Sequence, residues 1–493
     1  MARVFSGLLL TLALAVLVVP LALYAGPPVL AAFGAQQPQR QLVIPSYQEA
    51  PSSLAARETE FPVPANLESP LPDKDELAVL LDAELAVSGS GDFHGAVLDA
   101  LTGDIIYDLD GEAAVTPASS LKILTATAAL SVLGSETRFE TAVYQGADPD
   151  TIVLAGGGDV LLGSGESDPD TVVGRAGLQS LAEETADALA DRGTGKTVSI
   201  VVDDTLFTGA TVSPAWNDED VEAGEAAAVY PLAINSAWAV EGQQSGPRAE
   251  DAALSAGESF AAALDAAADK QGFDVDSEVT RGTADDGGAL LASASSATVA
   301  EQVQQMLLTS DNYLAETLGR MTARAAGGEG SFEGAVSAVV SAVSGLGVDT
   351  DGLVLADVSG LGGGTEISAV QLAGTVQAAL TSTDNSVREL AYSLPVAGLS
   401  GTLASRFTPD PAGPIPRATE TRNTETGDNP AAGLVRAKTG TLFAVTSLSG
   451  FVTDADGRLL SFAFVANSLD GNTAAARAAV DAAAAVLAGC GCR

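Results

Sequence analysis

Three short polar motifs occur in a fixed order along this 493-residue chain, and they constrain its fold more than any other feature. Ser119-Ser120-Leu121-Lys122 comes first, Ser310-Asp311-Asn312 second and Lys438-Thr439-Gly440 third. The chain has only five lysines, and two of them fall inside these motifs. Segments far apart in the sequence must therefore fold onto one site if the three motifs act together.

The first motif is expected at the start of a helix. Pro117 suits the position just ahead of a helix, and the run from Leu121 to Leu133 is mostly apolar. Residues three apart share one face of a helix, so the Lys122 amine can lie beside the Ser119 hydroxyl. A serine hydroxyl needs a neighbouring base to become a good nucleophile, and the start of a helix favours negative charge.

A lysine can act as that base only when its amine is uncharged. Burial favours the neutral amine, and so does a second cation nearby, for which Lys438 is the candidate. The chain has a single histidine, His94, so a Ser-His-Asp triad could use only that residue. A histidine-dependent esterase is therefore an alternative in which His94 would be essential. Otherwise His94 is a half-exposed strand residue.

Composition limits the class of protein. The chain is long enough for two or more domains, and its hydrophobic content of 46% allows a large core. Its net charge of −41 argues against nucleic acid as a partner, because phosphate binding needs Lys and Arg. One histidine and two tail cysteines, Cys490 and Cys492, are too few for a metal site. We therefore expect neither a metal nor a cofactor.

The N-terminal segment predicts export. Residues 1–25 contain Arg3 and an apolar stretch from Val4 to Tyr24, long for a signal peptide and just long enough to span a bilayer. An uncleaved membrane anchor is favoured over a cleaved signal sequence, and in both cases the rest of the chain is extracytoplasmic. Residues 26–72 are predicted to form a Pro-rich linker.

The remaining chain is expected to form one domain interrupted by another. Residues 73–137 and 291–493 would form the main domain, and residues 138–290 a smaller inserted domain, because this interval is too long for a loop. Within it, Gly193 to Thr197 resembles the end of a phosphate loop. Ala190 stands where such a loop needs glycine, so a helix end before a strand is expected instead.

Hydrophobic periodicity and turn residues predict the main elements. The expected helices are Asp73–Glu84, Leu121–Leu133, Gly177–Ala190, Val299–Leu308, Tyr313–Ala325 and Thr473–Leu487. The expected strands are two within Phe93–Asp110, then Thr151–Ala155, Thr197–Val202, Phe443–Thr453 and Arg458–Asn467.

With these motifs in place, the chain resembles the D-alanyl-D-alanine carboxypeptidase/endopeptidase family, the class C low-molecular-mass penicillin-binding proteins of cell-wall metabolism. The resemblance implies an α/β fold of the α+β type, a β-lactamase/transpeptidase-like antiparallel sheet flanked by helices, with an inserted smaller domain. It extends from about Gly95 to Ala488. It rests on Pro117-Ala118-Ser119, Gly156-Gly157-Gly158-Asp159, Asp357-Val358-Ser359-Gly360-Leu361, Leu394-Pro395-Val396-Ala397-Gly398, Gly401-Thr402-Leu403 and Ala437-Lys438-Thr439-Gly440-Thr441-Leu442.

The resemblance also implies a role for each catalytic residue. Ser119 would be the acylated nucleophile and Lys122 its base. Ser310 would relay a proton, and Asn312 would hold the substrate amide. Lys438 would supply positive charge. The reaction would be acyl transfer in two steps, in which D-alanine leaves and water then cleaves the acyl-enzyme.

The same resemblance assigns the substrate-binding segment to Thr439, Gly440, Thr441 and Leu442. Thr439 and Thr441 would bind the terminal carboxylate, and the N–H groups of Ser119 and Thr441 would form an oxyanion hole. The implied partners are peptidoglycan peptides ending in D-Ala-D-Ala, and β-lactam antibiotics as covalent inhibitors.

A further substrate contact is expected in the inserted domain. Trp216-Asn217-Asp218 resembles a family motif, which makes Asp218 the candidate to meet the free amine of a diamino acid. Asp218 also lies in an acidic loop of a very acidic protein, so a simple surface role stays open. Two departures from the family pattern bear on substrate details. The insert is short, and the segment from Gly242 to Asp251 stands where a second insert would be. The loop from Gly362 to Gly364 replaces a more polar sequence.

Two other functions stay open. A serine β-lactamase needs a device for rapid deacylation, such as a glutamate before the third motif. Only Glu425 and Asn429 have a Glu-x-x-x-Asn spacing here, and they lie close ahead of Lys438, so a surface loop explains them more simply. A catalytically inactive wall-binding module is the second alternative. Glu316 is expected to be a structural partner rather than an acid catalyst, and Trp216 is expected to pack in the interior.

Overall fold

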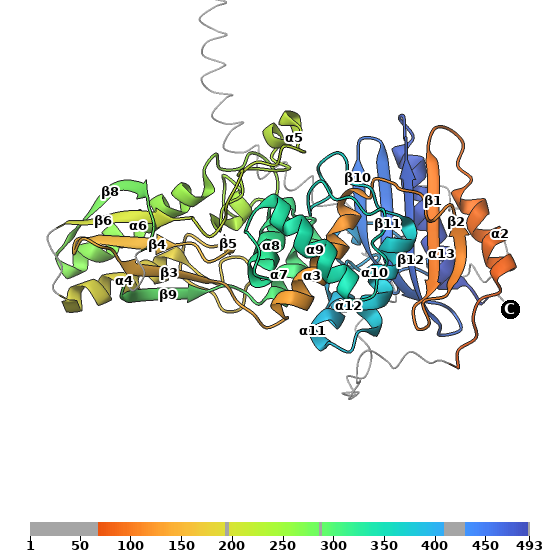
Figure 1. Cartoon of the computed structure of the whole chain (residues 1–493), viewed down its shortest axis with the longest axis horizontal. Helices are drawn as coiled ribbons and strands as arrows, with labels where there is room; N and C mark the ends of the chain where they lie inside the picture. The colour runs from red at the N-terminus through yellow and green to blue at the C-terminus, as the bar shows by residue number, and fades with distance from the viewer. Residues whose placement is uncertain (1–67, 193–196, 285–287, 409–428, 492–493) are drawn as a thin grey trace, which may run out of the picture. The chain divides into compact units, whose positions relative to one another are not determined.

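The computed structural model describes residues 68–192, 197–284, 288–408 and 429–491, which are coloured in Figure 1. The predicted anchor at 1–25, most of the 26–72 linker, residues 193–196 and Glu425 lie outside these ranges. Within the described ranges, no helix combines the length and apolarity that crossing a membrane requires.

The helices are α2 (Lys74–Leu85), α3 (Lys122–Leu133), α4 (Leu178–Arg192), α5 (Asp218–Glu222), α6 (Ala252–Gln271), α7 (Val299–Thr309), α8 (Asn312–Ala325), α9 (Phe332–Gly345), α10 (Ala369–Thr381), α11 (Asn385–Arg388), α12 (Leu390–Ser393) and α13 (Thr473–Gly489). The strands are β1 (Asp92–Asp99), β2 (Ile105–Leu109), β3 (Glu140–Gln145), β4 (Thr151–Ala155), β5 (Asp159–Leu162), β6 (Thr197–Asp203), β7 (Leu232–Ile234), β8 (Asp274–Arg281), β9 (Leu290–Ser295), β10 (Arg436–Leu442), β11 (Val445–Thr453) and β12 (Leu459–Asn467).

The first sheet joins the two ends of the described chain. Its order is β10-β11-β12-β1-β2 and every pair is antiparallel, with Asp92 opposite Asn467 at one end of the β1–β12 pair and Asp99 opposite Leu460 at the other. Figure 1 shows the orange strands β1 and β2 beside the blue strands β10 to β12. Strands β1 and β2 are therefore held in place by the C-terminal hairpin.

Helices cover both faces of this sheet because alternate strand residues point to opposite sides. Val97, Phe462 and Phe464 pack with α2 and α13 on one face. Ala463 and Val465 pack with α3, α9 and α10 on the other. The strands are therefore apolar on both faces, which is the pattern of a sheet enclosed between two layers.

A second sheet has the order β8-β6-β4-β3-β9, and all its strands come from residues 140–295. It is mixed, because β3 pairs antiparallel with β4 and β9, whereas β4, β6 and β8 run parallel. Helices α4 and α6 pack on it around their own apolar core, which contains Leu181, Phe260 and Leu264. The predicted domain boundaries stay a prediction.

Local signals set the ends of several helices. Thr298 and Glu301 form a capping box at the start of α7, and Ser368 and Gln371 form one at the start of α10. The Asp311 carboxylate caps α8 by accepting from two backbone N–H groups. These side chains fix where the helices that carry site residues begin.

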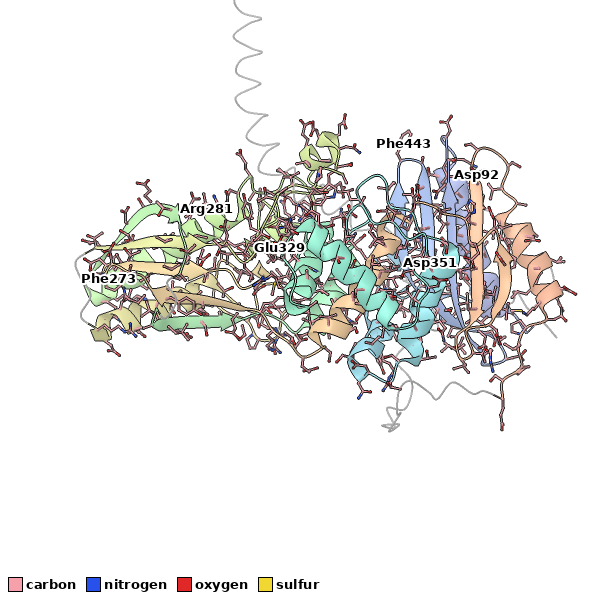
Figure 2. All side chains as sticks on the ribbon, in the orientation of Figure 1. Asp92, Phe273, Arg281, Glu329, Asp351 and Phe443 are labelled. Carbon is pink, nitrogen blue, oxygen red and sulfur yellow. The ribbon has the colours of Figure 1, made fainter. Side chains whose placement is uncertain are left out.

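The predicted α+β fold class is confirmed, and the expected helices and strands are present within a few residues of their predicted ends. One end differs clearly: the strand expected from Phe443 begins at Val445. Phe443 is 91% exposed, and it occupies the tight turn between β10 and β11, so it is a turn residue rather than a core residue (labelled in Figure 2).

A buried ion pair ties the first sheet together. Arg458, at the start of β12, donates from Nε to the Asp99 carboxylate at 2.9 Å, and both side chains are almost fully buried. Burial acts to raise the pKa of Asp99, but hydrogen bonds from Arg458 and Thr102 outweigh it and hold that pKa below its usual value. Removing the Asp99 carboxylate would take away the charged group that accepts from the Arg458 Nε.

Changing Asp99→Asn should lower the free energy of unfolding by about 3 kcal/mol at neutral pH, because buried Arg458 would lose the charged acceptor of its Nε hydrogen bond. Asp92→Asn, at the exposed start of the same strand (Figure 2), is the matched control and should stay within about 0.5 kcal/mol. Urea unfolding measures both. The Asp99 difference should shrink as the pH falls through the lowered pKa of Asp99, since the wild-type carboxylate is then protonated. Equal stabilities at neutral pH would show that the pair is not stabilising.

Candidate active site

The first motif lies on a 3-10 turn, Ala118–Leu121, that leads directly into α3. Ser119 is half-buried, whereas the Lys122 side chain is fully buried. The Lys122 amine lies 3.0 Å from the Ser119 hydroxyl oxygen and donates to it. The prediction that these two groups meet is therefore confirmed. The serine lies one turn ahead of α3 rather than within it.

The turn that carries Ser119 is held against the hairpin β10–β11. The Ser447 hydroxyl donates to the Pro117 carbonyl at 2.6 Å and lies 2.8 Å from the Ser120 hydroxyl. Gly440 faces Ser447 across the hairpin. A Cβ at Gly440 would lie 2.2 Å from the Ser447 hydroxyl and 2.5 Å from the Pro117 carbonyl, so only glycine allows this approach.

The second motif lies in the connection between α7 and α8. Ser310 ends α7 with a positive φ of 60°, and Asn312 is the first residue of α8. Lys122 donates to the Asn312 side-chain oxygen at 2.6 Å, and the Asn312 amide nitrogen donates to the Glu225 carbonyl at 2.9 Å. These two bonds fix the orientation of the Asn312 amide. Asp311 also pairs with buried Arg248 at 3.6 Å.

The third motif lies on β10, at the edge of the first sheet. Fully buried Lys438 donates to the Ser310 hydroxyl at 2.9 Å and to the Thr439 carbonyl at 2.8 Å. The Thr439 hydroxyl donates to that of Thr402 at 2.8 Å. Through Ser310, the third motif therefore contacts the second, which in turn contacts Lys122.

Burial favours the uncharged form of both lysine side chains. Burial lowers the pKa of Lys122 to about 8, although the carboxylates of Asp357 and Glu316 oppose that shift. Burial also lowers the pKa of Lys438 well below its usual value, and the charges of Lys122 and Arg406 lower it further. A lysine with a pKa near 8 is partly neutral near neutral pH, as a general base must be.

The remaining predicted substrate residues differ in their placement. Thr441 is exposed and Leu442 half-buried at the end of β10, next to Gly440. Asp218 is exposed on α5, and no hydrogen bond or ion pair joins it to the three motifs in the described part of the chain. The segment before it is anchored, because Trp216 donates from its indole nitrogen to Asp357 at 2.9 Å.

Other predicted residues lie away from the nucleophile. His94 contacts Asp110, with its Nδ1 atom 3.2 Å from the Asp110 carbonyl, and has no hydrogen bond to Ser119 among the described residues. Trp216 is buried and meets Phe332 edge-on at 5.3 Å, as expected of a packing residue. Within the described ranges, no group of His, Cys, Asp and Glu is arranged to hold a metal.

Sequence reasoning missed several groups that shape the site. Ser447 has no motif of its own, but counting residues across the β10–β11 turn would have placed it opposite Gly440. The carbonyls of Glu225 and Ser359 accept from Asn312 and Lys122, and a backbone carbonyl leaves no trace in the sequence. A cavity of about 140 Å³ adjoins the second motif and is lined partly by Glu225, Trp238, Arg248, Ser310 and Asn312.

A serine nucleophile, a buried lysine beside it and two further polar motifs on a helix-flanked antiparallel sheet together define an acyl-transferring serine enzyme. Comparisons with known proteins agree. The chain matches the model of the D-Ala-D-Ala carboxypeptidase 3 (S13) family over residues 77–242 and 235–488.

Two relatives cover most of the chain. Carboxypeptidase DacB of Mycolicibacterium smegmatis is 36% identical over 433 residues, 87% of each chain. A D-alanyl-D-alanine carboxypeptidase of Actinomadura sp. is 31% identical over 469 residues, 80% of each chain.

The fold is similar to solved structures of penicillin binding protein 4 (dacB) from Haemophilus influenzae. One has a TM-score of 0.62 at 20% identity, and another, complexed with a novel beta-lactam, has a TM-score of 0.57 at 22% identity. Each match covers 85% of this chain and 98% of the other. The chain belongs to the D-Ala-D-Ala carboxypeptidase 3 (S13) family, which confirms the resemblance seen in its motifs and makes it a hydrolase.

Changing Gly440→Ala should lower the acylation rate constant for a β-lactam about 100-fold, because the added Cβ would displace the turn that carries Ser119. Gly374→Ala on α10 is the control, since a Cβ there meets nothing within 4 Å, and it should acylate at the wild-type rate. Stopped-flow or gel-based acylation assays measure the rates, and thermal unfolding shows whether the variants fold. A folded Gly440→Ala enzyme with the wild-type rate would contradict this account of the hairpin contact.

Proposed function

We propose that this carboxypeptidase removes the terminal D-alanine from peptidoglycan stem peptides, through an ester formed on Ser119. The observation that carries the proposal is the Lys122 amine, fully buried and 3.0 Å from the Ser119 hydroxyl. The relatives named as carboxypeptidases support the choice of reaction. Cleavage of D-Ala-D-Ala cross-links as an endopeptidase would use the same chemistry.

In the first step, neutral Lys122 takes the proton of Ser119 as its Oγ attacks the carbonyl carbon of the penultimate D-alanine. The C–N bond then breaks, an ester forms on Ser119, and the leaving amine takes up a proton. This is the proton that Lys122 took from Ser119, so its transfer to the amine leaves Lys122 neutral again. Ser310 is proposed to relay it, which the contact of its hydroxyl with Lys438 supports.

In the second step, water attacks the ester carbonyl and gives up a proton, and Ser119 leaves with its hydroxyl restored. Lys122, neutral again, is proposed to accept the proton of that water, which its contact with Ser119 supports. The N–H groups of Ser119 and Thr441 are proposed to stabilise the oxyanion in both steps. The products are the shortened peptide and the free enzyme.

Substrate recognition is proposed to involve all three motifs. Lys438, Thr439 and Thr441 would attract the terminal carboxylate of D-alanine, Gly440 and Leu442 would present the β10 backbone to the peptide, and Asn312 would bind an amide of the peptide. A β-lactam would occupy the same place and acylate Ser119. The β-lactam complex of penicillin binding protein 4 supports that part of the proposal.

Incubation with a β-lactam should give a single covalent adduct on the peptide that contains Ser119, detected by mass spectrometry. Ser119→Ala should abolish the adduct and the release of D-alanine from a D-Ala-D-Ala peptide, because it removes the hydroxyl that the Lys122 amine contacts and on which the ester is proposed to form. His94→Ala is the matched control and should retain both activities, since His94 contacts Asp110 instead.

An adduct on another residue, or folded protein that forms none, would contradict the proposal. Loss of activity in His94→Ala would favour the histidine-dependent esterase. The same experiment tests the β-lactamase alternative, because a β-lactamase would release a cephalosporin product rapidly and turn over D-Ala-D-Ala peptides slowly. A carboxypeptidase keeps the drug-derived ester and turns over the peptide.

We also propose that Asp218 meets the free amine of the diamino acid in the stem peptide. Its support is an exposed carboxylate at the start of α5, two residues after Trp216, whose bond to Asp357 anchors this segment near the loop that accepts from Lys122. Export by the apolar segment between Val4 and Tyr24 fits a substrate in the cell wall, and it is proposed on the sequence alone.

Changing Asp218→Asn should raise KM about threefold for a D-Ala-D-Ala peptide with a free side-chain amine, the range expected of an exposed ion pair. The KM for the same peptide with its amine acetylated should not change. Glu222→Gln, at the other end of α5 and also exposed, is the control. A threefold rise that also occurs with the acetylated peptide would show that Asp218 does not read the amine.

A further inference from the structure

Glu316 is a buried carboxyl group that the proposed reaction does not use. It lies on α8 one turn after Asn312, so both side chains lie on the face of α8 that approaches α3. Its side chain is fully buried, and its Oε1 atom accepts from the Val358 N–H at 3.1 Å.

The Val358–Ser359 segment links Glu316 to Lys122. The Val358 N–H donates to Glu316, the Val358 carbonyl accepts from the Thr125 hydroxyl of α3 at 2.5 Å, and the Ser359 carbonyl accepts from Lys122 at 2.7 Å. The segment is therefore bonded to α8 on one side and to α3 on the other. These bonds hold the segment whose Ser359 carbonyl meets the Lys122 amine.

We propose that Glu316 is a positioning residue for Lys122, and that its carboxyl group holds the Val358–Ser359 backbone against the amine and sets the amine's affinity for its proton. This inference rests on the proposed function, since it concerns the base of that reaction. Glu316 does not touch the nucleophile, and it acts through the Ser359 carbonyl and through its charge.

The charges around the pair decide the sign of the effect. Asp357, Asp311 and Glu225 add negative charge near Lys122, Arg320 adds positive charge near Glu316, and Lys122 and Arg406 add positive charge near Lys438. Burial, with repulsion from Asp357, raises the pKa of Glu316 to about 8, although the hydrogen bond from the Val358 N–H acts to lower it. Glu316 is therefore mostly neutral at pH 7, and it becomes charged over the range in which Lys122 loses its proton.

An ionised Glu316 favours the protonated form of Lys122, so the two groups titrate together. The acylation rate of the wild-type enzyme should rise with pH around pH 8, over a broadened range. In Glu316→Gln the side-chain oxygen can still accept from Val358, but the negative charge cannot form. Lys122 should then lose its proton at a lower pH.

The test measures the acylation rate constant for benzylpenicillin against pH. In Glu316→Gln the part of this pH profile over which the rate constant rises, its rising limb, should move to lower pH by about one unit and become steeper. One unit is about the smallest pKa shift that a close opposite charge produces. Glu316→Ala also removes the acceptor, so its rate should fall about tenfold at every pH. Glu329→Gln, an exposed carboxylate in the connection from α8 to α9 (Figure 2), is the matched control and should leave the limb in place.

An unmoved limb in folded Glu316→Gln would overturn the electrostatic part of the inference. A wild-type rate in folded Glu316→Ala would overturn the positioning part. If Glu316→Ala does not fold, Glu316→Gln still decides, because it keeps the acceptor. Failure of the proposed function looks different, since the wild-type enzyme would then form no adduct on Ser119 at any pH.

Discussion

The buried amine of Lys122 is the group on which the rest of the site depends. It has three N–H donors when protonated, and they meet the Ser119 hydroxyl, the Asn312 side chain and the Ser359 carbonyl. An amine left unpaired in the interior would cost several kcal/mol, so these acceptors must arrive together when the chain folds. Each belongs to a different segment of the chain. The three hydrogen bonds that stabilise the buried lysine therefore also bring the segments of the site together.

The first sheet supplies the rigid support for this arrangement. β10 and β11 carry small residues where the turn of Ser119 approaches, and the Ser447 hydroxyl takes the place that a side chain at Gly440 would fill. Lys438 lies on β10, the strand that carries Gly440. The β10–β11 hairpin therefore holds both Lys438 and the turn that carries Ser119. A site on strands and helices is held more closely than one on loops, which suits a reaction in which reacting atoms must meet within a few tenths of an ångström.

Much of this could be predicted from the sequence. Residues that act through side chains in short motifs, such as Ser119, Lys122 and Lys438, carry a signal in their type and spacing. Groups that act through the backbone, such as the Ser359 carbonyl, carry none, because any residue has a carbonyl. The parallel pairing of β6 with β4 and β8 also could not be predicted, since it depends on how α4 and α6 pack rather than on local pattern. Asp218 could be named as an exposed acidic residue, but the amine that it is proposed to meet belongs to another molecule and leaves no pattern in this sequence.

The charge of the protein gives the buried lysines a further role. The chain has 64 acidic and 23 basic residues, yet its proposed substrate ends in a carboxylate. Salt screens exposed charges beyond about 10 Å at 0.1 M, so the acidic surface repels the peptide only weakly at a distance. Lys438 acts at contact distance and out of the solvent, where a charge is screened much less. Burial also lowers the pKa of Lys438 well below its usual value, so it opposes this charge. A bound carboxylate would act in the other direction, because a close opposite charge favours the protonated amine. Burial therefore favours the neutral amine that the proposed reaction needs at Lys122, whereas the proposed charge of Lys438 depends on the carboxylate that it meets.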